Sequence, residues 1–321
     1  MKKIIAITGA SGFIGNHLVK ELLKSGDYRI KLLSRNGLQE HSFSKEADVE
    51  VVIGDLLQPQ SLNKFLEEDC IVVNLVYLWN GGDSENVTAI LNLLQACKTA
   101  NIKRLLHCST AAVVGRVNDD IVTEQTDCRP ITDYGITKLK IEHIVSSMAK
   151  DNFDLAILRP TSVFGVDGKP LKKLTKDLTT RNKKLTNYLR SCLFGKRRMN
   201  LVCIENVVSS IIYLINYPKL LKNEIFIISD DDSPFNNFSD VERFLMQKLE
   251  IRDYVLSPLH FPYFILKLLL ACLGRNNINP HTIYSSYKLQ SIGFERVISF
   301  ETGLAKYASW YKAFIMIDKK A

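Results

Sequence analysis

A nine-residue stretch near the start of the chain, ITGASGFIG, constrains the fold more than any other part of the sequence. It runs from Ile7 to Gly15, follows the apolar residues 4–7, and precedes residues 16–23, whose apolar positions recur at helical spacing. Its glycines stand three residues apart, at Gly9, Gly12 and Gly15. The pattern predicts a strand, a tight turn and the start of a helix.

The helix that follows these glycines would begin with unpaired backbone N–H groups and a partial positive charge. Glycine lets a phosphate approach the backbone where a Cβ atom would obstruct it. A plain turn would use the same residues, so the glycine pattern alone does not identify a ligand. We expect a dinucleotide pyrophosphate at this turn if the rest of the chain carries matching chemistry.

Apolar strand-like runs alternate with helical patterns over the first half of the chain. The expected strands are 3–8, 29–33, 49–53, 71–76, 104–108 and 155–158, and the expected helices start at 13 or cover 61–68, 84–100 and 134–148. This alternation predicts an α/β fold, a Rossmann-type doubly wound parallel sheet, whose ligands bind at the carboxyl ends of the strands.

The regular alternation ends after Pro160. Residues 165–200 are basic and irregular, and strands at 201–204 and 224–228 flank a helix at 207–213. Ser239-x-x-Glu242 resembles a capping box that opens a helix to Leu249. We expect a dinucleotide-binding domain over 1–164 and a smaller C-terminal substrate-binding lobe over 165–321, with elements around 201–229 rejoining the first domain.

Composition narrows the class of protein. With 46% hydrophobic and 24% charged residues, the chain is typical of folded proteins. Lys and Arg exceed Asp and Glu by 42 to 34, and the excess is densest in residues 169–198, which could meet an anionic partner or simply be a solvated face. No nucleic-acid module is present, so we expect no nucleic-acid partner.

Two further features of the sequence indicate where in the cell the protein is expected and whether it enters a membrane. The seven cysteines contain no C-x-x-C pair, which is typical of a reduced, cytoplasmic protein, and the six histidines show no metal-binding spacing. Residues 263–273 are strongly apolar but too few to span a bilayer. We expect a buried helix there, with contact to a membrane surface as the alternative, and no stable membrane insertion.

The residues with the most specific chemistry are Tyr134 and Lys138. Four residues apart on a helix, they share one face, and an ammonium near a phenol would lower the tyrosine pKa. Upstream, the strand at 104–108 ends in the hydroxyls of Ser109 and Thr110, at the edge where such a sheet binds ligands. These hydroxyls could hold a substrate oxygen while Tyr134 exchanges a proton with it.

With these residues in place, the chain resembles the extended short-chain dehydrogenase/reductase superfamily, and within it the branch of nucleotide-sugar epimerases, dehydratases and reductases. The matching motifs extend over nearly the whole chain. They are TGASGFIG, GDL at 54–56, ENVTAILNLLQAC at 85–97, CST at 108–110, YGITK at 134–138, LRPTSVFG at 158–165 and RRMNLVCIENV at 197–207.

The resemblance implies a role for each matching residue. Thr110, Tyr134 and Lys138 would be catalytic, with Lys138 also binding the nicotinamide ribose, and Asn86 matches a helix asparagine that could equally be structural. The implied cofactor contacts are Gly9, Ser11, Gly12, Phe13, Ile14, Gly15, Ser34, Arg35, Asp55, Leu56, Ser109, Tyr134, Lys138, Pro160 and Thr161. Substrate would meet Ser109, Thr110 and the diphosphate-binding Arg197 or Arg198. The chain departs from the family at Val114 and at Val76–Tyr77, which changes the shape of the substrate pocket.

The second strand ends in Ser34 and Arg35. An acidic residue here would bind a ribose 2′-hydroxyl, whereas serine and arginine can meet a 2′-phosphate, so we expect NADP(H) rather than NAD(H). Tyr217–Pro218 and residues 223–230 resemble reductases of UDP-4-keto-6-deoxy-N-acetylhexosamines.

The function expected from these features is transfer of a hydride from NADPH to the 4-keto group of a UDP-sugar, in the biosynthesis of O-antigen-type surface polysaccharide. Tyr134 would be the proton donor. One alternative is an NAD-dependent nucleotide-sugar 4-epimerase, and another is a non-catalytic dinucleotide-binding regulatory protein. The broadly apolar helices at 84–100 and 134–148 further predict a homodimer.

Overall fold

The structure of the chain is a computed structural model, which describes residues 2–36, 43–259, 264, 272 and 279–318. The chain forms two compact units, and each is described by itself. Unit 1 comprises residues 1–113, 132–159 and 208–226, and unit 2 comprises 114–131, 160–207 and 227–321.

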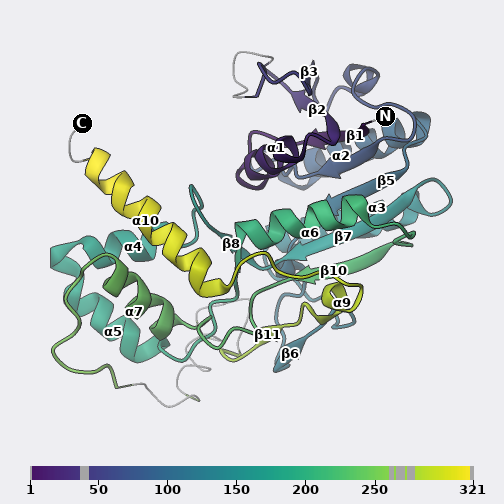
Figure 1. Cartoon of the computed structure of the whole chain (residues 1–321). Coiled ribbons are helices and arrows are strands. Elements are labelled where there is room, and N and C mark those ends of the chain that lie inside the picture. Colours follow the sequence, from purple (N-terminus) through teal and green to yellow (C-terminus); the bar gives the residue numbers. More distant parts are fainter. Residues whose placement is uncertain (1, 37–42, 260–263, 265–271, 273–278, 319–321) are drawn as a thin grey trace. The chain divides into compact units, whose positions relative to one another are not determined.

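Unit 1 is built around a seven-stranded sheet (Figure 1). Its strands are β1 (Lys3–Thr8), β2 (Tyr28–Ser34), β3 (Val49–Ile53), β4 (Ile71–Asn74), β5 (Arg104–Cys108), β7 (Asp154–Pro160) and β10 (Glu224–Ile228). They lie in the order β10-β7-β5-β4-β1-β2-β3, and the pairs from β7 to β3 are parallel. The predicted α/β fold with a doubly wound sheet is confirmed.

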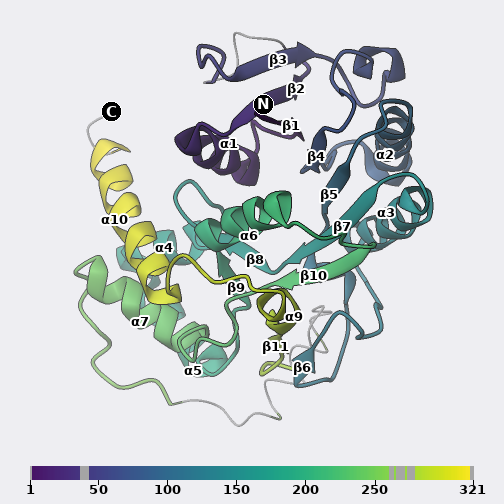
Figure 2. The ribbon, with the colours of Figure 1, turned by 45° about the vertical axis from the view of Figure 1, so that its right-hand side comes forward.

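Helices cover both faces of this sheet. Figure 2 shows α2 (Gly82–Thr99) and α3 (Asp133–Ala149) on one face and α1 (Phe13–Ser25) on the other. Leu93 and Leu94 of α2 and Val145 of α3 pack with β-strand residues in one buried apolar cluster. The inner strands β1, β4 and β7 are mostly apolar because both of their faces are buried.

Unit 2 contains short strands and a group of helices. The strand pairs are β8 (Ser162–Phe164) with β9 (Leu201–Cys203), and β6 (Ile121–Val122) with β11 (Ile283–Tyr284). The helices are α4 (Lys172–Thr179), α5 (Lys184–Phe194), α7 (Phe238–Lys248), α9 (Tyr287–Ser291) and α10 (Phe300–Asp318). The apolar faces of α4, α7 and α10 meet around the fully buried Phe164, Val241 and Tyr307.

Three local expectations were wrong. Residues 61–68 form no α-helix but a 3-10 turn at Pro59–Leu62, because a short segment between Pro59 and the left-handed Asp69 cannot sustain one. Residues 165–200 are not irregular, since α4 and α5 lie there. The side chain that caps α7 is Asn237, which accepts a hydrogen bond from the Asp240 amide, and not Ser239.

The predicted buried helix at 263–273 lies outside the described residues, apart from Phe264 and Cys272. Among the helices that the structure describes, none combines the length and the apolar character needed to cross a membrane.

A buried arginine attaches the end of α6 (Ile204–Asn216) to the sheet. Arg104, the first residue of β5, pairs with Asp154 of β7 at 2.7 Å, and these side chains are 4% and 3% exposed. Its guanidinium also donates to the carbonyl oxygens of Leu214, Tyr217 and Lys219. The Asp154 carboxylate accepts from the amides that follow, at Leu221 and Lys222. This network brings the segment before β10 back to the sheet.

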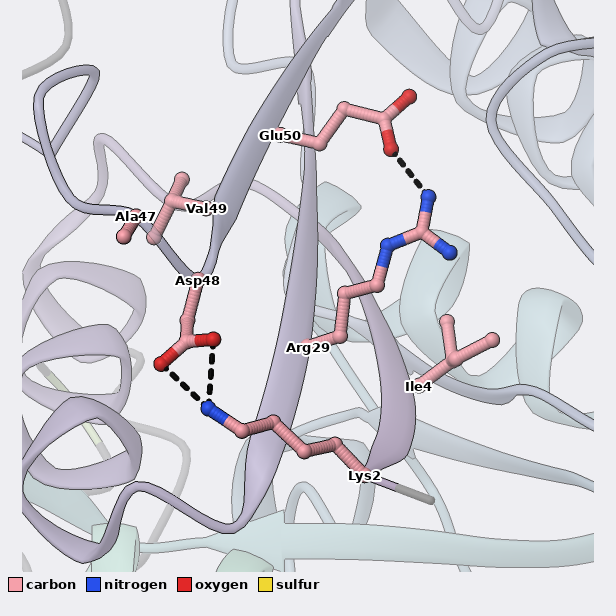
Figure 3. Close-up of a pocket in the computed structure, with 7 residues that line it drawn as sticks. All are labelled: Lys2, Ile4, Arg29, Ala47, Asp48, Val49 and Glu50. Atoms are coloured by element: carbon pink, nitrogen blue, oxygen red, sulfur yellow. Dashed lines mark hydrogen bonds and ion pairs between the residues drawn. The ribbon is translucent and has the colours of Figure 1, made fainter.

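A pocket of about 530 Å³ lies at the amino ends of β1, β2 and β3 (Figure 3). Its charged side chains neutralise one another, because Lys2 pairs with Asp48 and Arg29 with Glu50. Ligands of a doubly wound sheet bind at the carboxyl edge, so we assign this pocket no functional role.

We expect Arg104→Met to lower the free energy of unfolding by roughly 3–5 kcal/mol, because Asp154 would lose its buried counter-charge. Urea unfolding followed by circular dichroism measures the loss. The control is Lys24→Met, which breaks a pair whose side chains are 71% and 49% exposed and should cost less than about 1 kcal/mol. Equal, small losses in both variants would contradict the anchoring role.

Candidate active site

The glycine turn between β1 and α1 has the geometry that a bound pyrophosphate requires. Gly9 has a φ of +77°, and a Cβ atom on Gly15 would lie 2.2 Å from the Gly9 carbonyl oxygen. Gly12 is the N-cap of α1 and makes no side-chain capping bond. The first amides of α1, at Phe13, Ile14 and Gly15, are therefore free of a capping side chain and face a turn with no Cβ at its closest points. The exposed Ser11 completes the turn. These residues fit a dinucleotide phosphate.

Four more of the residues predicted to contact a cofactor lie at or just after the ends of the next two strands. Ser34 ends β2 half-buried, and Arg35 follows it, exposed and without an ion pair among the described residues. Beyond β3, one carboxylate oxygen of Asp55 accepts from the Leu57 amide at 2.9 Å. Leu56 packs into the apolar cluster of unit 1.

Helix α3 holds Tyr134 and Lys138 on one face. Thr132 caps this helix by accepting from the Gly135 amide at 3.2 Å, so Tyr134 lies in the first turn and Lys138 one turn later. The Lys138 ammonium is buried and donates to the Cys108 carbonyl oxygen at the end of β5, at 2.8 Å. This bond ties the helix with the tyrosine to the strand that precedes Ser109 and Thr110.

Thr110 and Tyr134 are brought together, as the motif spacing predicts. The Thr110 side chain forms a hydrogen bond with Tyr134, and its hydroxyl oxygen also accepts from the Ala112 amide at 3.2 Å. Ser109 is buried, its amide donates to Leu158 of β7, and its hydroxyl has no hydrogen-bond partner in the described structure.

The expected direction of the Tyr134 pKa was wrong. Burial raises the pKa of Tyr134 to about 12, and the hydrogen bond from Thr110 only partly opposes it. The Lys138 ammonium, which donates to the Cys108 carbonyl oxygen, does not offset this shift. Tyr134 is therefore a neutral phenol, which gives up its proton only to a stronger base such as an alkoxide.

Two neighbours influence the charge on Lys138. Burial lowers the pKa of Lys138, while Cys108 and the carboxylate of Glu142, one turn further along α3, oppose that shift. Glu142 is itself fixed by a buried ion pair with Arg159 of β7 at 2.6 Å.

Sequence reasoning missed a buried polar row beneath these residues. Thr8, Asn74 and His107 lie in register on β1, β4 and β5. The Thr8 hydroxyl donates to Asn74 Oδ1 at 2.7 Å, and Asn74 Nδ2 lies 3.1 Å from His107 Nδ1. Burial, aided by the Lys138 charge, lowers the pKa of His107, so its ring is neutral beside the ammonium. Only the strand register, which no single segment reveals, brings these three residues together.

The loop after β4 was noted only as a departure from the family pattern. Its rings at Tyr77 and Trp79 contact the ring of Tyr134, with centroids 4.8 and 5.0 Å away. Asn86 of α2 is buried and bonds to the backbone of this loop. The signal in the sequence that could have indicated this loop was the pair of aromatic residues a few positions before the helix asparagine Asn86.

The remaining predicted site residues lie in unit 2. Pro160 ends β7, and the Thr161 amide donates to Ile228 at 3.0 Å. Arg198 donates through Nη1 to the Ser233 carbonyl oxygen at 2.7 Å, and the Arg197 guanidinium lies 6.0 Å from the Phe194 ring. Among the described residues, no group of three or more His, Cys, Asp or Glu side chains is placed to hold a metal ion.

Comparison with known proteins gives consistent matches. A family model described as "NAD dependent epimerase/dehydratase family" matches residues 5–229, more than half of the chain. The chain is 27% identical over 250 residues to UDP-glucose 4-epimerase of Vibrio cholerae, covering 72% of this chain and 71% of that protein. The chain is also 27% identical over 208 residues to UDP-glucose 4-epimerase of Lactobacillus helveticus, and this match covers 60% of each protein.

The fold is shared with solved enzymes of this kind. UDP-glucuronic acid 4-epimerase from Bacillus cereus, solved in complex with NAD, superposes with a TM-score of 0.74 over 98% of both chains, at 21% identity. Because the family model covers the glycine turn, the Tyr134–Lys138 pair and the strands that carry them, the chain belongs to the NAD dependent epimerase/dehydratase family, the nucleotide-sugar branch of the extended short-chain dehydrogenase/reductase enzymes.

Proposed function

We propose that the protein is an NADP(H)-dependent reductase of a nucleotide-activated sugar, with a 4-keto group as the hydride acceptor. The observation that carries the proposal is the arrangement of three side chains: Tyr134 lies beside Thr110 and one turn from the buried ammonium of Lys138. A phenol placed in this way suits donation of a proton to an oxygen that has just become an alkoxide.

The roles of the chain's own residues follow from this arrangement. Thr110 and Ser109 hold the ketone oxygen, and Tyr134 donates its phenolic proton to that oxygen as the ketone becomes an alcohol. Lys138 would bind the nicotinamide ribose from its place one turn further along α3. The bound dinucleotide supplies the hydride. The glycine turn would hold the pyrophosphate of this dinucleotide, Asp55 would meet the adenine, and Pro160 and Thr161 would line the nicotinamide.

Arg35 supports the choice of NADP(H). A guanidinium that is exposed and unpaired among the described residues, directly after β2, is available to a ribose 2′-phosphate, and Ser34 can add a hydrogen bond. We extend the proposal to a UDP-sugar whose diphosphate is held by Arg197 or Arg198, and to a cytoplasmic role in making surface polysaccharide of the O-antigen type.

The outer faces of α2 and α3 support a homodimer. Leu91 of α2 and Ile136 of α3 are 40% and 48% exposed, so two apolar side chains on neighbouring helices face outward from unit 1. A second copy of the chain would bury them.

A second candidate is a 4-epimerase of a nucleotide sugar, which the related proteins favour because both named curated relatives are UDP-glucose 4-epimerases. The same Thr110, Tyr134 and Lys138 would serve it. An epimerase returns the hydride to the same sugar, so it needs a dinucleotide that stays bound, whereas a reductase exchanges its cofactor at every turnover.

The proposal predicts oxidation of NADPH when a UDP-4-keto-6-deoxy-N-acetylhexosamine is added, measured as loss of NADPH absorbance. Tyr134→Phe removes the proton donor and should lower kcat about 10²–10⁴-fold while leaving NADPH affinity within about twofold. No oxidation of NADPH or NADH, together with NAD released from the denatured protein, would instead identify the epimerase.

Arg35→Ala should weaken NADPH binding about tenfold or more, because one charge-assisted contact to a phosphate is lost. Its NADH affinity should change less than about twofold, since NADH has no 2′-phosphate. Quenching of protein fluorescence on cofactor binding measures both. Arg252→Ala, which removes another exposed arginine, is the control. A parallel loss of both affinities, or of neither, would refute the assignment to NADP(H).

The raised pKa of Tyr134 makes a prediction for the cofactor-free protein. Below about pH 10, where ordinary tyrosines begin to ionise, Tyr134 should remain a phenol, and its phenolate should form only near pH 12. The difference in phenolate absorbance between wild type and Tyr134→Phe, followed through an alkaline titration, isolates this residue. A difference that develops between about pH 7 and pH 9 would show that Lys138 lowers the pKa after all.

A further inference from the structure

Two aromatic rings pack against the ring of Tyr134, the proposed proton donor. Tyr134 of α3 is stacked on Trp79, with centroids 5.0 Å apart and planes inclined by 18°. Tyr77 stands edge-on to both, with its centroid 4.8 Å from that of Tyr134 and 4.9 Å from that of Trp79. The Lys138 ammonium lies 5.4 Å from the Tyr77 centroid. Both additional rings come from the loop that joins β4 to α2, at the carboxyl edge of the sheet.

This loop is fixed by a buried asparagine. Asn86 Oδ1 accepts from the Leu78 amide at 2.8 Å, and Asn86 Nδ2 donates to the carbonyl oxygens of Leu78 and Gly82 at 2.9 and 2.7 Å. Gly81 adds a turn bond to Leu78 at 3.1 Å. Leu78 stands between the two aromatic residues, so holding its amide and its carbonyl sets the direction of both side chains. Asn86 is 4% exposed, and its bonds are shielded from water.

Trp79 is held in place and yet is largely uncovered. Its side chain is 75% exposed, whereas Tyr134, against which it is stacked, is half-buried. An indole ring on a loop fixed by hydrogen bonds loses little further entropy when a ligand binds to it. An exposed indole face beside the ring of the proposed proton donor offers a surface on which a ligand can stack.

The chemistry at Tyr134 decides which part of the ligand meets Trp79. Any oxygen that Tyr134 protonates must lie within hydrogen-bond reach of its hydroxyl. If the proposed function holds, that oxygen is a substituent of a six-membered sugar ring, so the ring itself lies beside the Tyr134–Trp79 stack. One face of such a ring presents mainly C–H groups, which an indole face covers well, while the indole N–H remains able to bond to a hydroxyl.

We propose that Trp79 is a specificity-determining residue, the surface on which the sugar ring of the substrate stacks, and that Asn86 is the positioning residue that holds it there. This inference rests on the proposed function. It assigns recognition of the sugar to unit 1, through a residue for which the family resemblance supplied no role.

Tryptophan fluorescence tests the contact directly, because the chain has two tryptophans, at Trp79 and Trp310. In a Trp310→Phe background all tryptophan emission comes from Trp79. UDP-N-acetylglucosamine, which carries a sugar ring but no ketone, should shift or quench this emission, whereas UDP alone should leave it nearly unchanged. An equal change with UDP and with the UDP-sugar would overturn the proposal.

Variants measure what the contact contributes. Trp79→Ala should weaken binding of UDP-N-acetylglucosamine about tenfold in calorimetry, while UDP and NADPH affinities stay within about twofold. Trp79→Phe, which keeps an aromatic face, should recover most of the loss. Asn86→Ala should reproduce the selective loss for the UDP-sugar, with thermal unfolding measured alongside to confirm that the variant is folded.

The outcomes separate this inference from the function on which it rests. Wild-type protein that binds NADPH but neither UDP-sugar nor UDP would overturn the proposed function together with the role of Trp79. Wild type and Trp79→Ala that bind UDP-N-acetylglucosamine equally would leave the proposed function standing and refute the stacking surface alone.

Discussion

The hydrogen bond from Lys138 to the Cys108 carbonyl oxygen is the contact on which the geometry of the candidate site depends. A buried ammonium must find a partner, and the open carbonyl at the end of β5 supplies one at 2.8 Å. Because Tyr134 lies one turn before Lys138 and Thr110 follows Cys108, this single bond sets the tyrosine against the threonine. The buried pair of Glu142 and Arg159 then fixes the same helix to β7.

Most of the sheet could be predicted from the sequence because each strand is a local apolar run. The expected bounds of β1, β3, β5 and β10 agree with the structure. Helices α4 and α5 could not be found this way, because they are short and basic and their burial comes from packing in unit 2. The cap of α7 was misassigned because Ser239-x-x-Glu242 has the capping-box spacing, whereas Asn237 makes the bond.

The candidate site likewise has residues that the sequence could predict and features that it could not. Spacing along one helix and along one strand was enough to predict the pair Tyr134 and Lys138 and the hydroxyl of Thr110, and the structure brings these three together. The pKa of Tyr134 could not be predicted, because it depends on burial and on where the lysine charge points. The row of Thr8, Asn74 and His107 depends on strand register, and the Trp79 stack depends on a loop held by Asn86.

The central claim is that this site passes a hydride from exchangeable NADPH to a sugar ketone. NADPH carrying deuterium at the transferring position of its nicotinamide tests it most directly, with the product sugar examined by mass spectrometry and proton NMR. The account predicts one deuterium on C4 of the product for each NADPH oxidised. Interconversion of UDP-hexoses with no deuterium incorporated would contradict it and assign the protein to the epimerases.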